Sequence, residues 1–302
     1  MLELWQFEKI LIYYALWRYS TAMDLQSFKK NKAFLVCIDS DGCAIDSMNI
    51  KHINCFGPRM IDEWDLHKWS SEILESWNYV NLYSLTRGIN RFKGLLTALR
   101  EIDEKYIKIE GLDRFADWVE NTTELSNNSL TRAIESNPDS ICLKKALSWS
   151  NRVNESIKRL PEEDVVPFKM VKEALIFAHE KADVAIVSSA NLGAIMDEWE
   201  RHELLPYVDL VLAQNAGTKA YCIQELLKKG YDPSKVVMCG DAPGDMDAAK
   251  TNGVFYYPIK VNLEMESWAE FIDIGFNKLL DGSYAGDYQS QKIDEFIKNL
   301  TK

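Results

Sequence analysis

The amino-acid sequence predicts an α/β protein, in which a parallel sheet carries a large all-helical insertion. Two observations predict the sheet. Short apolar segments alternate with amphipathic segments from residue 168 to 258, and polar residues directly follow several of the apolar segments. A third observation predicts the insertion, because residues 48–165 show helical periods and almost no strand pattern. A chain of 302 residues is long enough to bury a core in both parts.

The first predicted strand lies in "FLVCIDSDGCAID", residues 34–46, where an apolar run ends at Asp39 and Asp41 with Gly42 behind them. Two carboxylates held this close together raise each other's pKa values. They cost stability unless a cation or a chemical role compensates them. The segment therefore predicts a functional site at the end of a buried strand.

The predicted insertion contains three long helical patterns, "DEWDLHKWSSEILESWNYVNLYSL", "RFKGLLTALREIDEKY" and "ICLKKALSWSNRVNESIKRL". Its end is marked by "RLPEEDVVPF", which carries two prolines and an acidic run. We assign residues 48–165 to the insertion, and residues 31–47 and 166–302 to the α/β core. We expect Trp64, Trp69 and Trp77 to pack between the helices of the insertion.

Strands and helices alternate after this boundary. In order, the sequence predicts the helix "KMVKEALIFAHEKA", the strand "DVAIVSS", the helix "LGAIMDEWERHE", the strand "VDLVLA", the helix "TKAYCIQELLKKG", the strand "KVVMCGD", the helix "PGDMDAAKTNG" and the strand "VFYYPI". The tail from about residue 262 is partly helical. Such alternation implies right-handed crossovers, and functional sites at the carboxyl ends of the strands.

Residues 1–30 are predicted to form a helical extension. The longest apolar run in their first part, Ile10 to Trp17, is too short to span a bilayer. It also lacks the basic region that begins a secretory signal. An amphipathic helix packed on the domain is favoured, with peripheral membrane contact or a disordered start as the alternatives. We expect no integral membrane segment.

Composition excludes some partners. The 35 lysines and arginines against 46 aspartates and glutamates give a net charge of -11, which disfavours a nucleic-acid surface. The six cysteines are scattered without metal-ligand spacing. We therefore expect reduced cysteines and a cytoplasmic protein. Nothing in the sequence predicts the oligomeric state.

Polar residues at the predicted strand ends should meet in one crevice of the sheet. They are Asp39, Asp41, Ser188, Lys219 and, in "GDAPGD", Asp241 and Asp245. Four carboxylates and one lysine sum to about -3, a costly charge in a cleft of low dielectric. A divalent cation would compensate it, and carboxylate, carbonyl and water oxygens suit Mg²⁺. A substrate phosphate commonly completes such a site, so the pattern favours phosphoryl transfer.

These residues resemble the four motifs of the haloacid dehalogenase-like hydrolase superfamily, in its phosphatase branch with a helical cap inserted after the first motif. The motifs are "DSDG" at 39–42, Ser188 in "VAIVSS", Lys219 in "AGTKAY" and "GDAPGD" at 240–245. The resemblance covers residues about 32–47 and 168–258. Its four motifs in the family's order make it specific, and it implies a Rossmann-like core with a large helical cap.

The resemblance implies a role for each motif residue. Asp39 would be the nucleophile that forms an aspartyl-phosphate, and Asp41 the acid and then the base. Ser188 would donate a hydrogen bond to a phosphoryl oxygen, and Lys219 would neutralise charge. The ligands of Mg²⁺ would be Asp39, the backbone carbonyl of Asp41, and Asp241, with Asp245 bound to the ion directly or next to it.

Substrate-binding residues are expected in two places. Ser189 and Asn191 follow the second motif. In the insertion, "LTRGINRF" places Arg87 and Arg91 within one predicted helical turn, as an anion-binding fork or as a solvated helix face. Cys43 stands where the family usually carries Thr or Val, and a small buried side chain could support the loop as well.

The sequence favours a Mg²⁺-dependent phosphatase that acts on a small phosphorylated metabolite. Asp41 supports phosphoryl chemistry, because dehalogenases that attack carbon lack an Asp at this position. A phosphonatase or a phosphomutase on the same core is the first alternative. A receiver-like or non-catalytic phosphate-binding module is a more distant one, disfavoured by the DxDG order and by the insertion.

Overall fold

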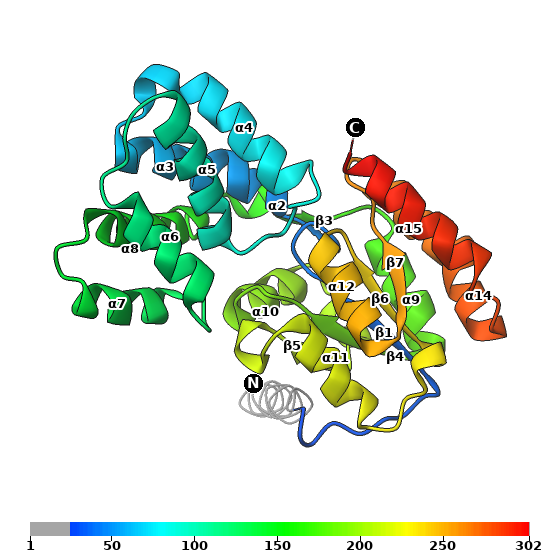
Figure 1. Cartoon of the computed structure of the whole chain (residues 1–302). Helices are drawn as coiled ribbons and strands as arrows, with labels where there is room; N and C mark the ends of the chain where they lie inside the picture. Colours follow the sequence, from blue (N-terminus) through cyan, green and yellow to red (C-terminus); the bar gives the residue numbers. More distant parts are fainter. Residues whose placement is uncertain (1–24, 302) are drawn as a thin grey trace, which may run out of the picture. The chain divides into compact units, whose positions relative to one another are not determined.

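The structure is a computed structural model that describes residues 25–301, and these residues form two compact units (Figure 1). The first unit, the core, comprises residues 25–45 and Val166–Asn299. The second unit, the cap, comprises Asp46–Val165 with residues 300 and 301. Most of the predicted N-terminal extension, residues 1–24, lies outside the described residues. Residues 25–30 form a turn and irregular chain and are not helical.

The core is built on a parallel sheet, as predicted. Within residues 25–301 this sheet has five strands in the order β5-β4-β1-β6-β7. The strands are β1 (Phe34–Ile38), β4 (Ala182–Val187), β5 (Leu210–Leu212), β6 (Val236–Gly240) and β7 (Phe255–Pro258). In the central strand, Val36 pairs with Val184 on one side and with Val237 on the other. Because β1 has a neighbour on each side, its carboxyl end lies between those of β4 and β6.

Helices cover both faces of this sheet, which explains why its strands are near-continuous apolar runs (Figure 1). Helices α11 and α12 pack together, and α9 packs with α13 and η7. The main core helices are α9 (Val171–Lys181), α10 (Leu192–Arg201), α11 (Lys219–Leu227), α12 (Pro243–Asn252), α13 (Glu264–Glu270), η7 (Phe271–Gly275), α14 (Phe276–Asp281) and α15 (Asp287–Asn299). Short 3₁₀ turns are η4 (Leu205–Tyr207), η5 (Gln214–Ala216) and η6 (Pro233–Lys235). Every strand and helix predicted between residues 168 and 258 is present.

The cap is helical. Its elements are α2 (Met48–Lys51), η1 (His52–Phe56), α3 (Gly57–Trp64), η2 (His67–Trp69), α4 (Ser70–Leu82), α5 (Arg91–Lys105), α6 (Leu112–Asn121), α7 (Asn127–Ser136), α8 (Ile141–Ile157) and η3 (Glu162–Asp164). Two short strands, β2 (Ile45–Asp46) and β3 (Val166–Pro167), pair where the chain enters and leaves this unit. The pattern around residue 65 is not one helix, because Asp65 adopts a left-handed conformation with φ 55° and ends α3.

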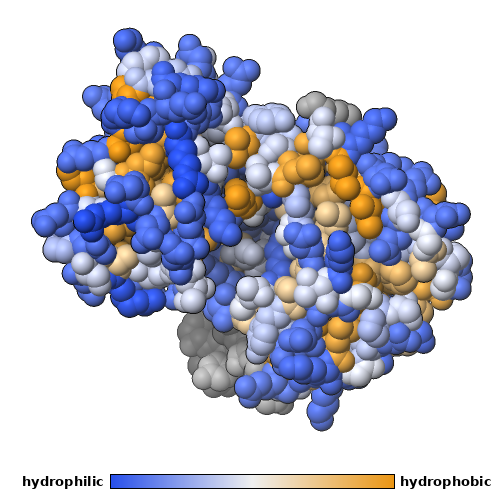
Figure 2. Space-filling model, in the orientation of Figure 1, coloured by the Kyte–Doolittle hydropathy of each residue, from blue (hydrophilic) through white to orange (hydrophobic). Residues whose placement is uncertain are grey.

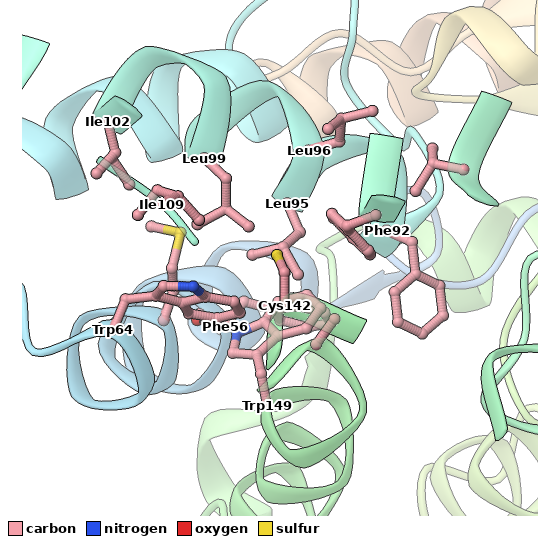
Figure 3. Packing of buried hydrophobic residues seen from close by; sticks show 14 of the residues in the cluster. Phe56, Trp64, Phe92, Leu95, Leu96, Leu99, Ile102, Ile109, Cys142 and Trp149 are labelled. Atoms are coloured by element: carbon pink, nitrogen blue, oxygen red, sulfur yellow. Dashed lines mark hydrogen bonds between the residues drawn. The ribbon is translucent and has the colours of Figure 1, made fainter. Parts of the chain in front are cut away.

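The cap has its own aromatic core (Figure 3). Leu99 of α5 lies over Trp64 of α3, Leu95 lies beside Cys142, and Trp149 of α8 reaches into the same cluster. The indole Nε1 of Trp149 donates to the carbonyl of Phe56 at 3.1 Å. Trp64 and Trp77 belong to this cluster and Trp69 packs against it. The prediction that these tryptophans join the cap helices is confirmed.

The visible surface of each unit is mostly hydrophilic, with hydrophobic side chains in small separate groups (Figure 2). All six cysteines are buried and free. None of the helices within residues 25–301 combines the length and the hydrophobicity that crossing a membrane would require.

Candidate functional site

The loop after β1 carries Asp39 and Asp41. Three amides, those of Cys43, Ala44 and Ile45, donate to the Ser40 carbonyl at 3.3, 3.0 and 2.9 Å, which folds the loop tightly on itself. Gly42 has φ 79°, a left-handed conformation that glycine adopts without strain, and its amide donates to the Ile45 carbonyl at 2.9 Å. The Asp39 carboxylate accepts from the Ser40 amide at 2.8 Å and is buried. The loop thus fixes Asp39 and leaves Asp41 half-buried.

Strand β4 places Ser188, and the start of helix α11 places Lys219. Ser188 directly follows β4 and is buried, and its Oγ accepts from the Ala190 amide at 3.2 Å. Lys219 is the first residue of α11, whose N-cap is the Thr218 side chain. The ammonium group of Lys219 is therefore delivered by a helix start rather than by a strand.

Strand β6 and helix α12 place the other two acids. Asp241 follows Gly240, the last residue of β6, and Asp245 lies in the first turn of α12. Both carboxylates are buried, and Asp245 Oδ2 accepts from the Ala242 amide at 3.1 Å. A Cβ atom at Gly240 would lie 2.3 Å from Asp245 Cγ, so only glycine fits beside this carboxylate.

The site residues form one charged cluster. Lys219 Nζ lies 2.6 Å from Asp39 Oδ2 and 2.5 Å from Asp245 Oδ1. One carboxylate oxygen from each of Asp39, Asp241 and Asp245 lies within 4.8 Å of the others. Three carboxylates against one ammonium leave about two negative charges, counting each group as fully ionised. A set of three buried carboxylates fits a hard divalent cation, which oxygen ligands prefer.

The electrostatics of the cluster show the same excess of negative charge. Burial and the carboxylates of Asp39 and Asp241 raise the pKa of Asp245 to about 7, against the opposing charge of Lys219. Burial by itself would lower the pKa of Lys219. The carboxylates of Asp245 and Asp39 outweigh it and raise that pKa above its usual value. Lys219 therefore stays charged, and the raised pKa of Asp245 reflects negative charge that Lys219 alone does not compensate.

The structure brings together Asp39, Lys219, Asp241 and Asp245, and places Asp41 and Ser188 at adjacent strand ends. The side chain of Asn191 has a structural task, because its Oδ1 accepts from the Gly193 amide at 2.9 Å and caps α10. Ser189 is exposed. A role for Ser189 or Asn191 in substrate binding stays a prediction.

The two cap arginines do not share a helical face, so that expectation is wrong. Residues 83–90 form bends, turns and irregular chain, and α5 begins only at Arg91. The alternative of a solvated face is also wrong for Arg87, which is 3% exposed and donates from Nη1 to the Leu82 carbonyl at 2.8 Å. Gly88, with φ 72°, turns the chain between the two arginines.

Arg91 is held differently from Arg87. Its Nη1 donates to Ser150 Oγ at 3.1 Å and to Asn154 Oδ1 at 2.7 Å, and its guanidinium carbon lies 5.1 Å from the centre of the Phe56 ring. These neighbours are all neutral, and burial lowers the pKa of Arg91 to about 10. Arg91 is thus a partly buried cation against neutral groups.

Sequence reasoning missed three aromatic residues that hydrogen-bond to the segments carrying the site residues. Trp199 donates to Ser40, Trp268 to the Cys43 carbonyl, and Tyr256 to the Gly240 carbonyl. No local signal could have found Trp199 and Trp268, because they lie 159 and 225 residues along the chain from the residues that they contact. Tyr256 lies in β7, the strand paired with β6.

Comparison with known proteins finds a similarity over part of the chain. A model of the family described as "haloacid dehalogenase-like hydrolase" matches residues 115–258, from the cap helix α6 to the end of β7. This range contains Ser188, Lys219 and the "GDAPGD" motif in the positions described above. Over these residues the chain is similar to the haloacid dehalogenase-like hydrolases. The first motif, at 39–42, precedes the matched residues and is placed beside the others by the sheet.

Solved structures described as haloacid dehalogenase-like hydrolases are similar to this chain at low sequence identity. A haloacid dehalogenase-like family hydrolase from Streptococcus pneumoniae superposes with a TM-score of 0.47 at 14% identity, over 78% of this chain and 90% of that chain. A haloacid dehalogenase-like family hydrolase from Xanthomonas campestris superposes with a TM-score of 0.44 at 12% identity, over 89% of this chain and 97% of that chain. No curated protein sequence matches the chain.

Proposed function

We propose that this hydrolase is a Mg²⁺-dependent phosphatase, which hydrolyses the phosphate ester of a small metabolite through an aspartyl-phosphate on Asp39. The observation that carries the proposal is the charged cluster at the ends of β1 and β6. Lys219 bridges Asp39 and Asp245 at 2.6 and 2.5 Å, and Asp241 completes three mutually close carboxylates. An anionic substrate enters such a cluster only if a further cation balances it.

Mg²⁺ is the cation that the donor set fits best. Asp39, Asp241 and Asp245 offer buried carboxylate oxygens, and the backbone carbonyl of Asp41 is the fourth protein ligand that we propose. When bound, the ion would offset the charge of the carboxylates and of the phosphate and would orient the phosphate group.

In the first step, a carboxylate oxygen of Asp39 attacks phosphorus and the ester P–O bond breaks. Asp41, two residues further in the same loop, gives its proton to the leaving oxygen. Half-burial of Asp41 suits this role, because an acid must reach the leaving group while it is partly shielded from water. The products are an alcohol, an aspartyl-phosphate and an ionised Asp41.

In the second step, water attacks the phosphorus of the aspartyl-phosphate and gives a proton to Asp41. The acyl–phosphate bond breaks, which releases inorganic phosphate and restores both carboxyl groups. Lys219 compensates charge at Asp39 throughout, because it stays protonated beside it. The hydroxyl of Ser188, at the end of β4, would donate to a phosphoryl oxygen.

Arg91 is the cap residue that we propose for substrate selection. Its guanidinium is held by Ser150 and Asn154, which leave its charge uncompensated by any acid among its hydrogen-bond partners. An anionic group of a substrate, other than the phosphate that is cleaved, would compensate it with charge-assisted hydrogen bonds. Arg87 instead donates to the Leu82 carbonyl, which makes it a weaker candidate for substrate binding.

The test is the release of inorganic phosphate from a panel of phosphorylated metabolites and from 4-nitrophenyl phosphate. We expect turnover with Mg²⁺, none in excess EDTA, and poor activity with Ca²⁺, whose looser coordination misaligns the attacking carboxylate. A phosphonate and a sugar phosphate with a second hydroxyl belong in the panel. Cleavage of the phosphonate alone, or isomerisation without release of phosphate, would replace the proposal by a phosphonatase or a phosphomutase. No reaction with any compound would overturn it.

A further inference from the structure

Two buried tryptophans hold the loop between the catalytic carboxylates. Trp199 of α10 donates from its indole Nε1 to Ser40 Oγ at 2.9 Å. Trp268 of α13 donates from its indole Nε1 to the Cys43 carbonyl at 3.0 Å. Both indole rings are fully buried, and so are Ser40 and Cys43. A buried indole N–H needs an acceptor, and here both acceptors belong to one loop of six residues, 39–44.

The contact of Trp199 fixes the residue between the two acids. Ser40 separates Asp39 from Asp41 in the chain, and its carbonyl accepts three amides of the following turn. Any rotation of Ser40 therefore moves both carboxylates and the Asp41 carbonyl at once. The indole N–H holds the side chain of Ser40 from the side of α10, which leaves this residue one orientation.

The contact of Trp268 fixes the far end of the same turn. The Cys43 carbonyl accepts from the indole, while Cys43 Sγ lies 3.5 Å from the Cys239 carbonyl of β6. The amide of Asp39 donates to that same carbonyl at 3.0 Å. Cys43 thus connects the nucleophile loop to the strand that leads to Asp241, and Trp268 holds Cys43 in place.

We propose that Trp199 and Trp268 are positioning residues, which set the geometry of Asp39 and Asp41 for phosphoryl transfer through the indole N–H groups. This inference rests on the proposed phosphatase function. Its physical reason is that a nucleophile and an acid two residues apart must both reach one ester, so small displacements of their loop cost rate. The rings fill the core, but the N–H groups give the loop its single conformation.

The test compares three variants with a matched control. Trp199→Phe and Trp268→Phe keep a buried aromatic ring and remove the donor, and Ser40→Ala removes the acceptor of Trp199 with little change in volume. Trp149→Phe is the control, because Trp149 is equally buried and donates to the Phe56 carbonyl at 3.1 Å within the cap. All four are assayed with 4-nitrophenyl phosphate at a temperature well below the unfolding midpoint of each.

We expect kcat to fall about 10- to 100-fold in the three loop variants, with KM changed less than about twofold, because a misplaced catalytic group slows chemistry more than binding. Trp149→Phe should lower the unfolding midpoint by a similar amount and leave kcat near that of the unaltered enzyme. The double variant Ser40→Ala with Trp199→Phe should be no slower than either single variant, because both lose the same hydrogen bond. Additive losses of kcat in the double variant, or a loss of kcat in Trp149→Phe equal to that of the loop variants, would contradict the positioning role. The tryptophans would then only fill the core.

Hydrogen exchange separates a failure of this inference from a failure of the proposed function. In the full chain, the amides of Cys43, Ala44 and Ile45 should exchange faster in Ser40→Ala and Trp199→Phe than in Trp149→Phe. Faster exchange in an enzyme without phosphatase activity would retain the positioning role and overturn the function. Unchanged exchange together with unchanged kcat in the loop variants would overturn the positioning role alone.

Discussion

The core and the cap bury charge in different ways. In the core, Asp39, Asp241 and Asp245 are gathered around Lys219, so that the charges contact each other directly. In the cap, Arg87 donates to a backbone carbonyl and Arg91 to neutral side chains, beside an aromatic cluster. The acids and the lysine of the core thus contact each other directly, whereas Arg91 of the cap contacts neutral side chains.

The difference also concerns how each unit is encoded. Core residues sit at the ends of strands, where short segments such as "DSDG" and "GDAPGD" place them. The polar residues of the cap are placed by contacts between helices that are distant in the sequence. Arg91 of α5, for example, contacts Asn154 of α8. A substitution in the core should therefore change catalysis, and one in the cap should change stability or substrate choice.

The largest expected effect is that of Asp39→Asn, because an amide cannot form the acyl phosphate. Turnover should fall by about 10⁴-fold or more. Asn keeps the hydrogen bond from the Ser40 amide, and one carboxylate fewer relieves repulsion in the cluster, so the fold should persist. Phosphate release measures the turnover and circular dichroism measures the fold. Asp113→Asn, a substitution of an exposed cap residue, is the control. Full activity in a pure Asp39→Asn preparation would contradict the nucleophile assignment.

Asp41→Asn should have the next largest effect, since the amide keeps the shape but carries no transferable proton. For an alkyl phosphate the loss should be about 10²- to 10⁴-fold. An aryl ester with a good leaving group should lose less in the first step. Rapid-quench measurement of phosphoenzyme formation tests this, and equal losses for the two esters would remove the acid role.

The same substitution, glycine to alanine at a closely packed position, can be made in each unit. A Cβ at Gly240 would meet Asp245 Cγ at 2.3 Å in the core, and a Cβ at Gly94 would meet Asn81 Oδ1 at 2.5 Å in the cap. Gly240→Ala should displace Asp245 and lower kcat about 10²-fold, with weaker affinity for Mg²⁺. Gly94→Ala should instead cost about 1–3 kcal/mol of unfolding free energy through overpacking and leave kcat for 4-nitrophenyl phosphate nearly unchanged.

Gly244→Ala is the control for both, because no atom outside its own helix lies within 4 Å of the Cβ that it would add. Alanine in this position of α12 should be neutral or slightly stabilising. Kinetics, titration with Mg²⁺ and urea unfolding measure the three variants. A loss of kcat in Gly94→Ala as large as in Gly240→Ala would contradict the claim that substitutions in the core change catalysis whereas those in the cap change stability.

The smallest expected effect separates the two arginines. Arg91→Ala should raise KM for the true substrate about tenfold, the equivalent of one charge-assisted hydrogen bond, and leave 4-nitrophenyl phosphate unaffected. Arg87→Ala should instead remove about 1–3 kcal/mol of unfolding free energy, because the Leu82 carbonyl loses its donor. Kinetics and urea unfolding of both variants test these roles. A raised KM in Arg87→Ala but not in Arg91→Ala would assign substrate binding to Arg87 instead of Arg91.

The sequence by itself determined the α/β core, the parallel sheet and the place of the helical cap. It also placed Asp39, Asp41, Ser188, Lys219, Asp241 and Asp245 at strand ends and helix starts. These features are local, because each motif lies within a few residues of the strand or helix that positions it. The carboxyl ends of parallel strands then meet at one edge of the sheet, so local order was enough to predict the cluster.

Only the tertiary structure decided how the cluster is supported and what the cap arginines contact. Trp199 lies 159 residues from Ser40 and Trp268 lies 225 residues from Cys43, so no pattern in either neighbourhood could link them. Helical spacing predicted a shared face for Arg87 and Arg91, yet the chain turns at Gly88 and α5 begins at Arg91. Periodicity predicts which residues share a helix face only where the helix continues, and tertiary packing decides where it stops.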